Sequence, residues 1–141
     1  MTKQIYSCLW FDGQAKAAAD FYCSVFKDGK ITTNHPIVVM FEINGTKFMG
    51  LNGGPKFQQS EAVSFVVDCD TQEEIDYYWD KLTADGGQES MCGWLKDKFG
   101  VSWQIIPTII GSLMTDPEKA QRVMPVLMQM QKLDIEKLKN A

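Results

Sequence analysis

The chain contains two similar segments, and this similarity constrains its fold more than any other feature. Shifting the sequence by 56 residues superposes apolar and acidic positions of the first half on positions of the same kind in the second half. The aligned pairs are Leu9 with Phe65, Phe11 with Val67, Asp12 with Asp68, Phe21 with Tyr77, Tyr22 with Tyr78 and Phe26 with Leu82. A shift of 55 then aligns Gly45 with Gly100 and Phe48 with Trp103. A chance likeness of two amphipathic α/β segments is the alternative to an internal repeat.

Hydrophobic periodicity predicts the same order of elements in both halves, a strand, a helix and then further strands. In the first half we expect strands over 3–11, 30–33, 37–43 and 46–51 and a helix over 14–26, with Asn44-Gly45 as a hairpin turn. In the second half we expect strands over 63–69, 91–96 and 101–106 and a helix over 71–84. The sequence therefore predicts an α+β fold of two β-α-β-β-β modules, 3–52 and 62–107.

The segment after the second module is of a different kind. Asp116-Pro117-Glu118 supplies a helix cap, a proline at the first helical position and an acid in the first turn. Pro125 predicts a kink or a break in this helix, and a second short helix is expected over 134–139. We interpret the methionine-rich face as adaptable core or interface. These helices form a C-terminal extension, 116–140, of a single domain spanning 1–141.

Composition narrows the possible functions. The chain has 141 residues, a formal net charge of −4 and no long Lys/Arg run, which argues against nucleic-acid binding. No apolar stretch approaches the roughly 18–20 residues of a membrane span, and the N-terminus lacks the pattern of a secretory signal. The four cysteines contain no CxxC pair, which is typical of reduced thiols. We therefore expect a cytoplasmic protein with no membrane or nucleic-acid partner.

Three strings carry a resemblance to a known family: CLWFDGQAKAAADFY, SFVVDCDTQEEIDYYWDKL and CGWLKDKFGVSWQIIP. They resemble PhnB-like proteins, described as 3-demethylubiquinone-9 3-methyltransferase-like, in the glyoxalase, bleomycin-resistance and extradiol dioxygenase (vicinal oxygen chelate) superfamily. The tail DPEKAQRVMPVLMQMQKLDIEKL is similar to that family's C-terminal extension. The resemblance implies two paired modules, a sheet in each that curves into a cup, and a homodimer.

The resemblance also implies where a metal would bind in metal-using members. Those positions correspond here to Tyr6 and Met49 in the first module and to Ala62 and Gln104 in the second. Among these residues and their neighbours, only Glu61 is a good ligand for a hard cation, whereas a divalent site needs roughly three convergent O or N donors. We therefore predict no metal and no cofactor. The single histidine, His35, is interpreted as a turn residue before Pro36, or as a base or ligand that needs a partner chain.

Strand alternation within the implied cup predicts a ligand pocket of aromatic, sulfur-containing and small polar side chains. Its residues are Tyr6, Cys8, Trp10, Met49, Leu51, Ser64, Trp94, Ser102 and Gln104. Such a mixture is typical of small-molecule sites, although the same residues could simply fill the interior.

Three functions remain open at this point. The first is a metal-free protein that binds a small molecule. The second is an enzyme of the same superfamily, either a methyltransferase acting on a quinone-like aromatic or a metal-dependent isomerase, with catalytic residues unassigned. The first strand-to-helix turn has only one glycine, Gly13, and no methyl-donor motif is visible. The third is a dimeric interaction module whose methionine-rich tail docks a partner.

Overall fold

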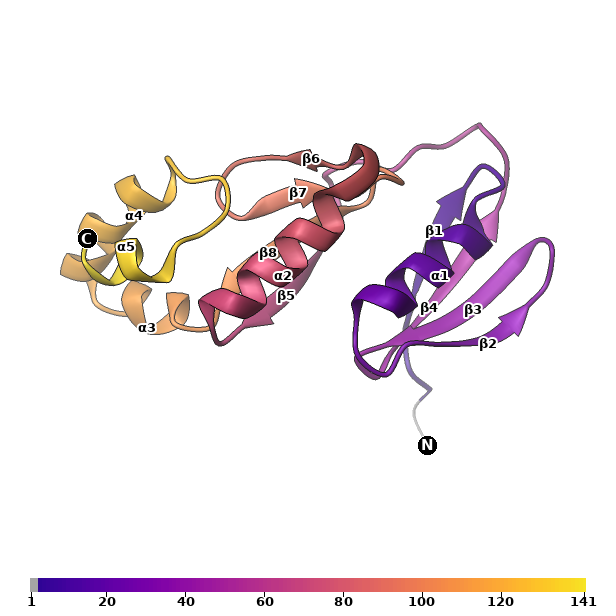
Figure 1. The fold of residues 1–141 in the computed structure, drawn as a ribbon, viewed down its shortest axis with the longest axis horizontal. Coiled ribbons are helices and arrows are strands. Elements are labelled where there is room, and N and C mark those ends of the chain that lie inside the picture. Colours follow the sequence, from indigo (N-terminus) through magenta and orange to yellow (C-terminus); the bar gives the residue numbers. More distant parts are fainter. Residues whose placement is uncertain (1–2) are drawn as a thin grey trace. The chain divides into compact units, whose positions relative to one another are not determined.

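A computed structural model describes residues 3–141 (Figure 1). The chain divides into two compact units between Gln59 and Ser60. The first unit holds the first module, and the second unit holds the second module with the C-terminal extension. Each module is one four-stranded mixed sheet with one helix on it, and the two sheets have the same strand order. The predicted α+β class and the C-terminal helices are thereby confirmed.

The first module contains one helix and four strands. In chain order they are β1 (Ser7–Phe11), α1 (Ala15–Val25), β2 (Lys30–Asn34), β3 (Val38–Ile43) and β4 (Thr46–Asn52). The strand order is β1-β4-β3-β2, with β1 parallel to β4 and the other neighbours antiparallel. Alternate strand residues point toward α1 and are buried: Leu9, Phe11, Val39, Phe41, Ile43 and Phe48. They meet a helix face rich in alanine, so the helix lies close to the sheet.

The second module follows the same plan. Its elements are β5 (Ser64–Cys69), α2 (Gln72–Thr83), the 3-10 helix η1 (Ala84–Gly86), β6 (Gln88–Glu89), β7 (Trp94–Lys96) and β8 (Ser102–Pro107). The strand order is β5-β8-β7-β6. Helix α2 packs on one face of this sheet through its buried residues, which are Ile75, Tyr78, Trp79 and Leu82. Asp97, buried in the β7–β8 turn, accepts hydrogen bonds from the N–H groups of Phe99, Val101 and the Trp103 indole.

The C-terminal extension has its own small core. It consists of α3 (Ile110–Met114), α4 (Pro117–Leu127) and α5 (Ile135–Lys139), and the fully buried residues are Val123, Leu133 and Leu138. Backbone hydrogen bonds attach it to the second module, because the N–H groups of Cys92 and Gly93 donate to carbonyls of Met130 and Gln131 at 2.8 and 2.9 Å.

The side chain of Gln72 makes a further attachment at the start of α2. Its amide nitrogen donates to the carbonyl of Leu133 at 3.0 Å, and its amide oxygen accepts from the N–H of Ile135 at 2.8 Å. Nearby, Lys132 forms an ion pair with Asp76 at 2.9 Å. This ion pair lowers the pKa of Asp76 and raises the pKa of Lys132. The extension is therefore held by side-chain, backbone and apolar contacts together.

Several expectations about local structure are wrong. The predicted strand over 3–11 begins only at Ser7, so Tyr6 precedes β1. The predicted strand over 91–96 is only β7, because Cys92 and Gly93 adopt positive φ and give their N–H groups to the extension. Of the two alternatives predicted at Pro125, a kink or a break, the break is absent, since α4 continues to Leu127 and the N–H of Met128 donates to the carbonyl of Met124 at 2.9 Å. Pro125 lies in the last turn of this helix, where it removes the one hydrogen bond that its N–H would have donated to the carbonyl of Gln121. The β-α-β-β-β pattern implies a further strand in the second module, to which the sequence assigned no residues and which is β6, whereas helix α3 was not expected.

Replacing Gly93 by alanine tests how the extension meets the sheet. Gly93 has φ of +84°, and an added Cβ would lie 2.9 Å from the carbonyl oxygen of Ile105 and 3.1 Å from Leu133. We expect Gly93→Ala to cost about 1–2 kcal/mol for the left-handed backbone and about 1–3 kcal/mol more for crowding. Urea unfolding followed by tryptophan fluorescence measures this loss.

Gly86→Ala is the matched control, because Gly86 belongs to the same unit and has φ of +111°, yet its nearest neighbour would be 4.0 Å away. The Gly86→Ala variant should therefore lose only the stability that the positive φ costs, without the loss due to crowding. Equal losses of stability in the two variants would contradict the close approach at Gly93.

Candidate functional site

The first module leaves one face of its sheet without a helix. Residues on this face alternate with those buried under α1, and the strand register places Cys8 opposite Met49 and Trp10 opposite Leu51. Met40 of β3 lies opposite Met49 on the same face. We call these five residues the first open face. Its side chains are apolar or contain sulfur, and all are partly or fully exposed.

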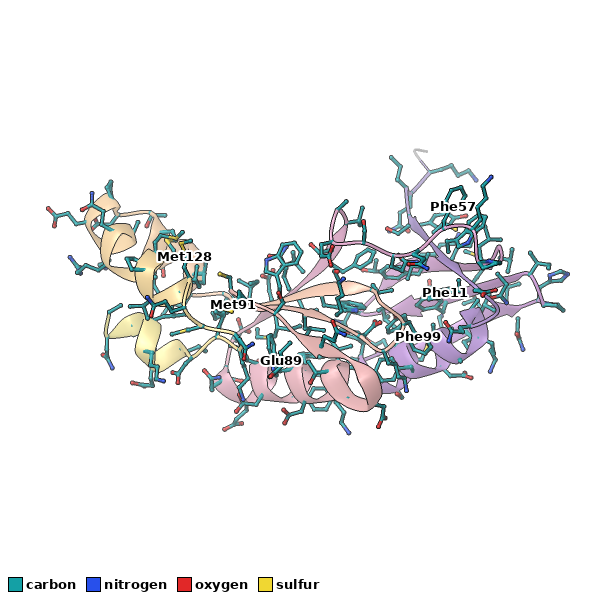
Figure 2. The ribbon with its side chains drawn as sticks, turned by 90° about the horizontal axis from the view of Figure 1, so that it is seen from above. Phe11, Phe57, Glu89, Met91, Phe99 and Met128 are labelled. Carbon is teal, nitrogen blue, oxygen red and sulfur yellow. The ribbon has the colours of Figure 1, made fainter. Side chains whose placement is uncertain are left out.

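The loop after β4 packs on Trp10 at one end of this face. The indole N–H of Trp10 donates to the carbonyl of Gly54 at 2.8 Å, and its ring meets Phe57 edge-on with centroids 4.9 Å apart. Figure 2 labels Phe57 on this loop. Gly53 is required here, because an added Cβ would clash with the Trp10 ring. At the end of the loop, the side-chain amide of Gln59 donates a hydrogen bond of 2.6 Å to the carbonyl of Trp10. Trp10 thus offers a ligand only its ring.

Polar groups at the first open face have limited reactivity. The ammonium of Lys47 lies 4.3 Å from the ring centroid of Tyr6, which is 39% exposed just before β1. Burial raises the pKa of the Cys8 thiol, so the protonated form dominates at neutral pH and nucleophilic attack by a thiolate is disfavoured. This arrangement suits binding better than covalent chemistry.

The second module also leaves one sheet face without a helix. Ser64, Ser102, Gln104 and Trp94 all lie on it, since Ser64 is opposite Ser102 and Trp94 is opposite Gln104. The amide of Gln104 donates to the Ser64 hydroxyl at 2.9 Å. Val66 of β5 is opposite Gln104 and is largely exposed. We call these five residues the second open face.

The nine residues predicted from sequence thus fall into two sets. Tyr6, Cys8, Trp10, Met49 and Leu51 belong to the first module, and Ser64, Trp94, Ser102 and Gln104 belong to the second. Ile106, which alternation also places on the second face, packs instead on the core of the C-terminal extension. The sequence indicates a loop at Gly53-Gly54-Pro55, but sequence reasoning missed the packing of this loop on Trp10 and an ion pair between Glu61 and Lys96. The glycine pair at 53–54 was a signal for the loop, whereas nothing local pointed to the ion pair.

The donor set at the superfamily's metal positions does not fit a divalent ion. Ala62 has no side-chain donor atom, Met49 offers a soft thioether, and Gln104 offers only the neutral oxygen of an amide. Across residues 3–141, no group of three or more His, Cys, Asp or Glu side chains is placed to hold a metal. His35 is exposed, and its Nδ1 accepts from the N–H of Ile37 at 3.2 Å, as a turn residue would.

No helix among the described residues is long and apolar enough to cross a membrane.

Comparison with known proteins identifies the family. Residues 3–106 match the family model described as 3-demethylubiquinone-9 3-methyltransferase. The PhnB protein from Bacillus cereus, which carries the same description, is 32% identical over 75% of this chain and 100% of its own, with a TM-score of 0.68. No curated protein matches the sequence.

More distant structures share the fold. Protein PA1353 from Pseudomonas aeruginosa is 18% identical over 75% of this chain and 98% of its own, with a TM-score of 0.62. The fosfomycin resistance protein FosX from Listeria monocytogenes is 12% identical over 75% and 91%, with a TM-score of 0.55. Because its sequence matches this family model and its fold matches the Bacillus cereus structure, the chain belongs to the PhnB-like, 3-demethylubiquinone-9 3-methyltransferase family.

Proposed function

We propose that the protein binds a small molecule without a metal, and that the first open face is a binding surface. The observation that carries the proposal is an apolar, sulfur-rich sheet face that α1 leaves uncovered. An antiparallel or mixed sheet with one solvated face normally carries polar side chains there. Cys8, Trp10, Met40, Met49 and Leu51 depart from this pattern, and exposed apolar patches commonly mark binding sites.

The residues of this face favour a flat, weakly polar ligand. The Trp10 ring offers a stacking surface, while its N–H is already bonded to Gly54. Met40 and Met49 are flexible and polarisable, so they can adapt to an aromatic or branched ligand. Lys47 beside Tyr6 supplies a cation at the edge of the face.

Methyl transfer is the second candidate, because the matching family and the Bacillus cereus relative carry that description. Methyl donors with a nucleotide part are often held at a helix N-terminus after a strand. In the first module the N–H of Ala15, at the start of α1, already donates to the Asn52 side chain at 2.9 Å. Saturable binding of S-adenosylmethionine in a calorimetric titration would nevertheless favour methyl transfer over simple binding.

Replacing Met49 by lysine tests the first open face with an uncharged apolar probe, Nile red. A charge in the middle of the face removes apolar surface and disfavours the dye, so we expect Met49→Lys to weaken binding at least about tenfold, or about 1.4 kcal/mol. Dye fluorescence during titration measures the affinity.

Met128→Lys is the matched control, since Met128 lies at the end of α4 in the extension and is exposed (Figure 2). We expect it to leave the affinity within about twofold of the original. Unchanged dye binding in Met49→Lys would show that this face is not the binding surface.

Native mass spectrometry tests the assembly and the absence of a metal together. We expect a homodimer at twice the chain mass of 16.0 kDa with no added metal. A species of single-chain mass would contradict the dimer. A mass increase equal to about one divalent ion per chain would contradict the metal-free proposal and would direct attention to isomerase chemistry.

A further inference from the structure

Three polar side chains, Ser64 and Ser102 of the second open face and Lys96 beside them, form a row across the sheet. The register places Ser64 of β5 opposite Ser102 of β8, and Ser102 opposite Lys96 of β7. Residues directly opposite one another on neighbouring strands share a face and lie close together. The neighbouring residues Phe65, Leu95 and Trp103 point the other way, and Leu95 and Trp103 are fully buried. The row is therefore on the side of the sheet away from α2.

The hydroxyl of Ser102, at the centre of this row, has no partner. Its residue is 1% exposed, and its oxygen forms no hydrogen bond with any described residue. A buried polar group without a partner costs roughly 1–3 kcal/mol, and such groups are rare in folded proteins. Ser64, its neighbour on the same face, is already bonded to Gln104. An unused hydroxyl on a sheet face indicates that a missing group completes its bonding.

A carboxylate of the chain itself, that of Glu61, pairs with the lysine at one end of the same row. Glu61, just before β5, forms an ion pair with Lys96 on β7, so the pair bridges the central strand that carries Ser102. A bridge at this position accounts for a shielded hydroxyl on an otherwise open face. Both charged side chains remain partly exposed, and Lys96 lowers the pKa of Glu61, which keeps this carboxylate ionised. Ion pairs of this exposure are weak and exchange readily.

We propose that Glu61 occupies the place of a ligand carboxylate, and that a carboxylic acid with an aromatic or apolar body displaces it to bind Lys96 and Ser102. One ammonium and one hydroxyl match the single charge and the acceptor oxygens of a carboxylate. The next row of the same face supplies surface for the body of the ligand, since Trp94 and Val66 flank Gln104 there. This inference rests on the proposed function only in supposing that an open sheet face binds a small molecule.

The test compares 2-naphthoate with 2-naphthamide, which have the same ring system and differ in charge. Calorimetric titration of the full chain should show that naphthoate binds at least about tenfold more tightly, a difference of about 1.4 kcal/mol. Lys96→Gln should abolish this preference, and Ser102→Ala should weaken naphthoate several-fold. Glu61→Gln should tighten naphthoate binding, because it removes the internal competitor. A purely structural ion pair gives no reason for that gain.

Lys98→Gln is the matched control, since Lys98 lies in the adjoining β7–β8 turn and outside the row. It removes the same charge and should keep the preference for naphthoate. Retained preference in Lys96→Gln, unchanged or weaker naphthoate binding in Glu61→Gln, or no binding of naphthoate to the original protein would each overturn the inference. Nile red binding to the first open face is measured separately, so failure of this inference is distinguishable from failure of the proposed function.

Discussion

Each sheet of this protein has a single helix to cover it, and the rest of the structure follows from that limit. A strand alternates its side chains between two faces, so one helix can bury only half of the sheet. In the first module, α1 takes Leu9, Phe11 and Phe48 and leaves Cys8 and Met49 on the other side. The same division in the second module leaves Ser102 and Gln104 away from α2. Candidate binding residues therefore arise directly from the packing of the core.

The two open faces differ in chemistry although their backbones share one plan. The first presents sulfur, aromatic and aliphatic groups, with Lys47 at its edge. The second presents hydroxyls and an amide beside Trp94, with an ion pair beside them. Only the positions are dictated by strand order, while the side chains at those positions decide what binds. A family defined by this fold can therefore contain proteins with different ligands.

Sequence patterns predicted the features that depend on the local spacing of apolar residues. They failed where a contact between residues far apart in the sequence determines the structure. Alternation placed Cys8 and Trp10 on one side of β1 and Leu9 on the other, as the structure has them. By contrast, the Trp10–Gly54 hydrogen bond spans 44 positions, and Lys96 of β7 forms its ion pair with Glu61 in the turn before β5. The expected strand over 91–96 was shortened for the same reason, because Cys92 donates its N–H to Met130. Secondary-structure propensity and hydrophobic periodicity contain no information about such long-range partners.

The C-terminal extension limits the second open face. Ile106 follows Gln104 by two residues and would lie on that face, yet it packs on the core formed by Val123, Leu133 and Leu138. Gly93 allows this close packing, because a side chain there would meet Leu133 and Ile105. The extension is thus fixed to the sheet at the start of β7 and near the end of β8. Lys96 and Ser102 lie at the opposite ends of these two strands. Loosening it would expose apolar surface at Ile106 and lengthen the face, so the anchoring of the extension and the extent of the second open face are physically coupled.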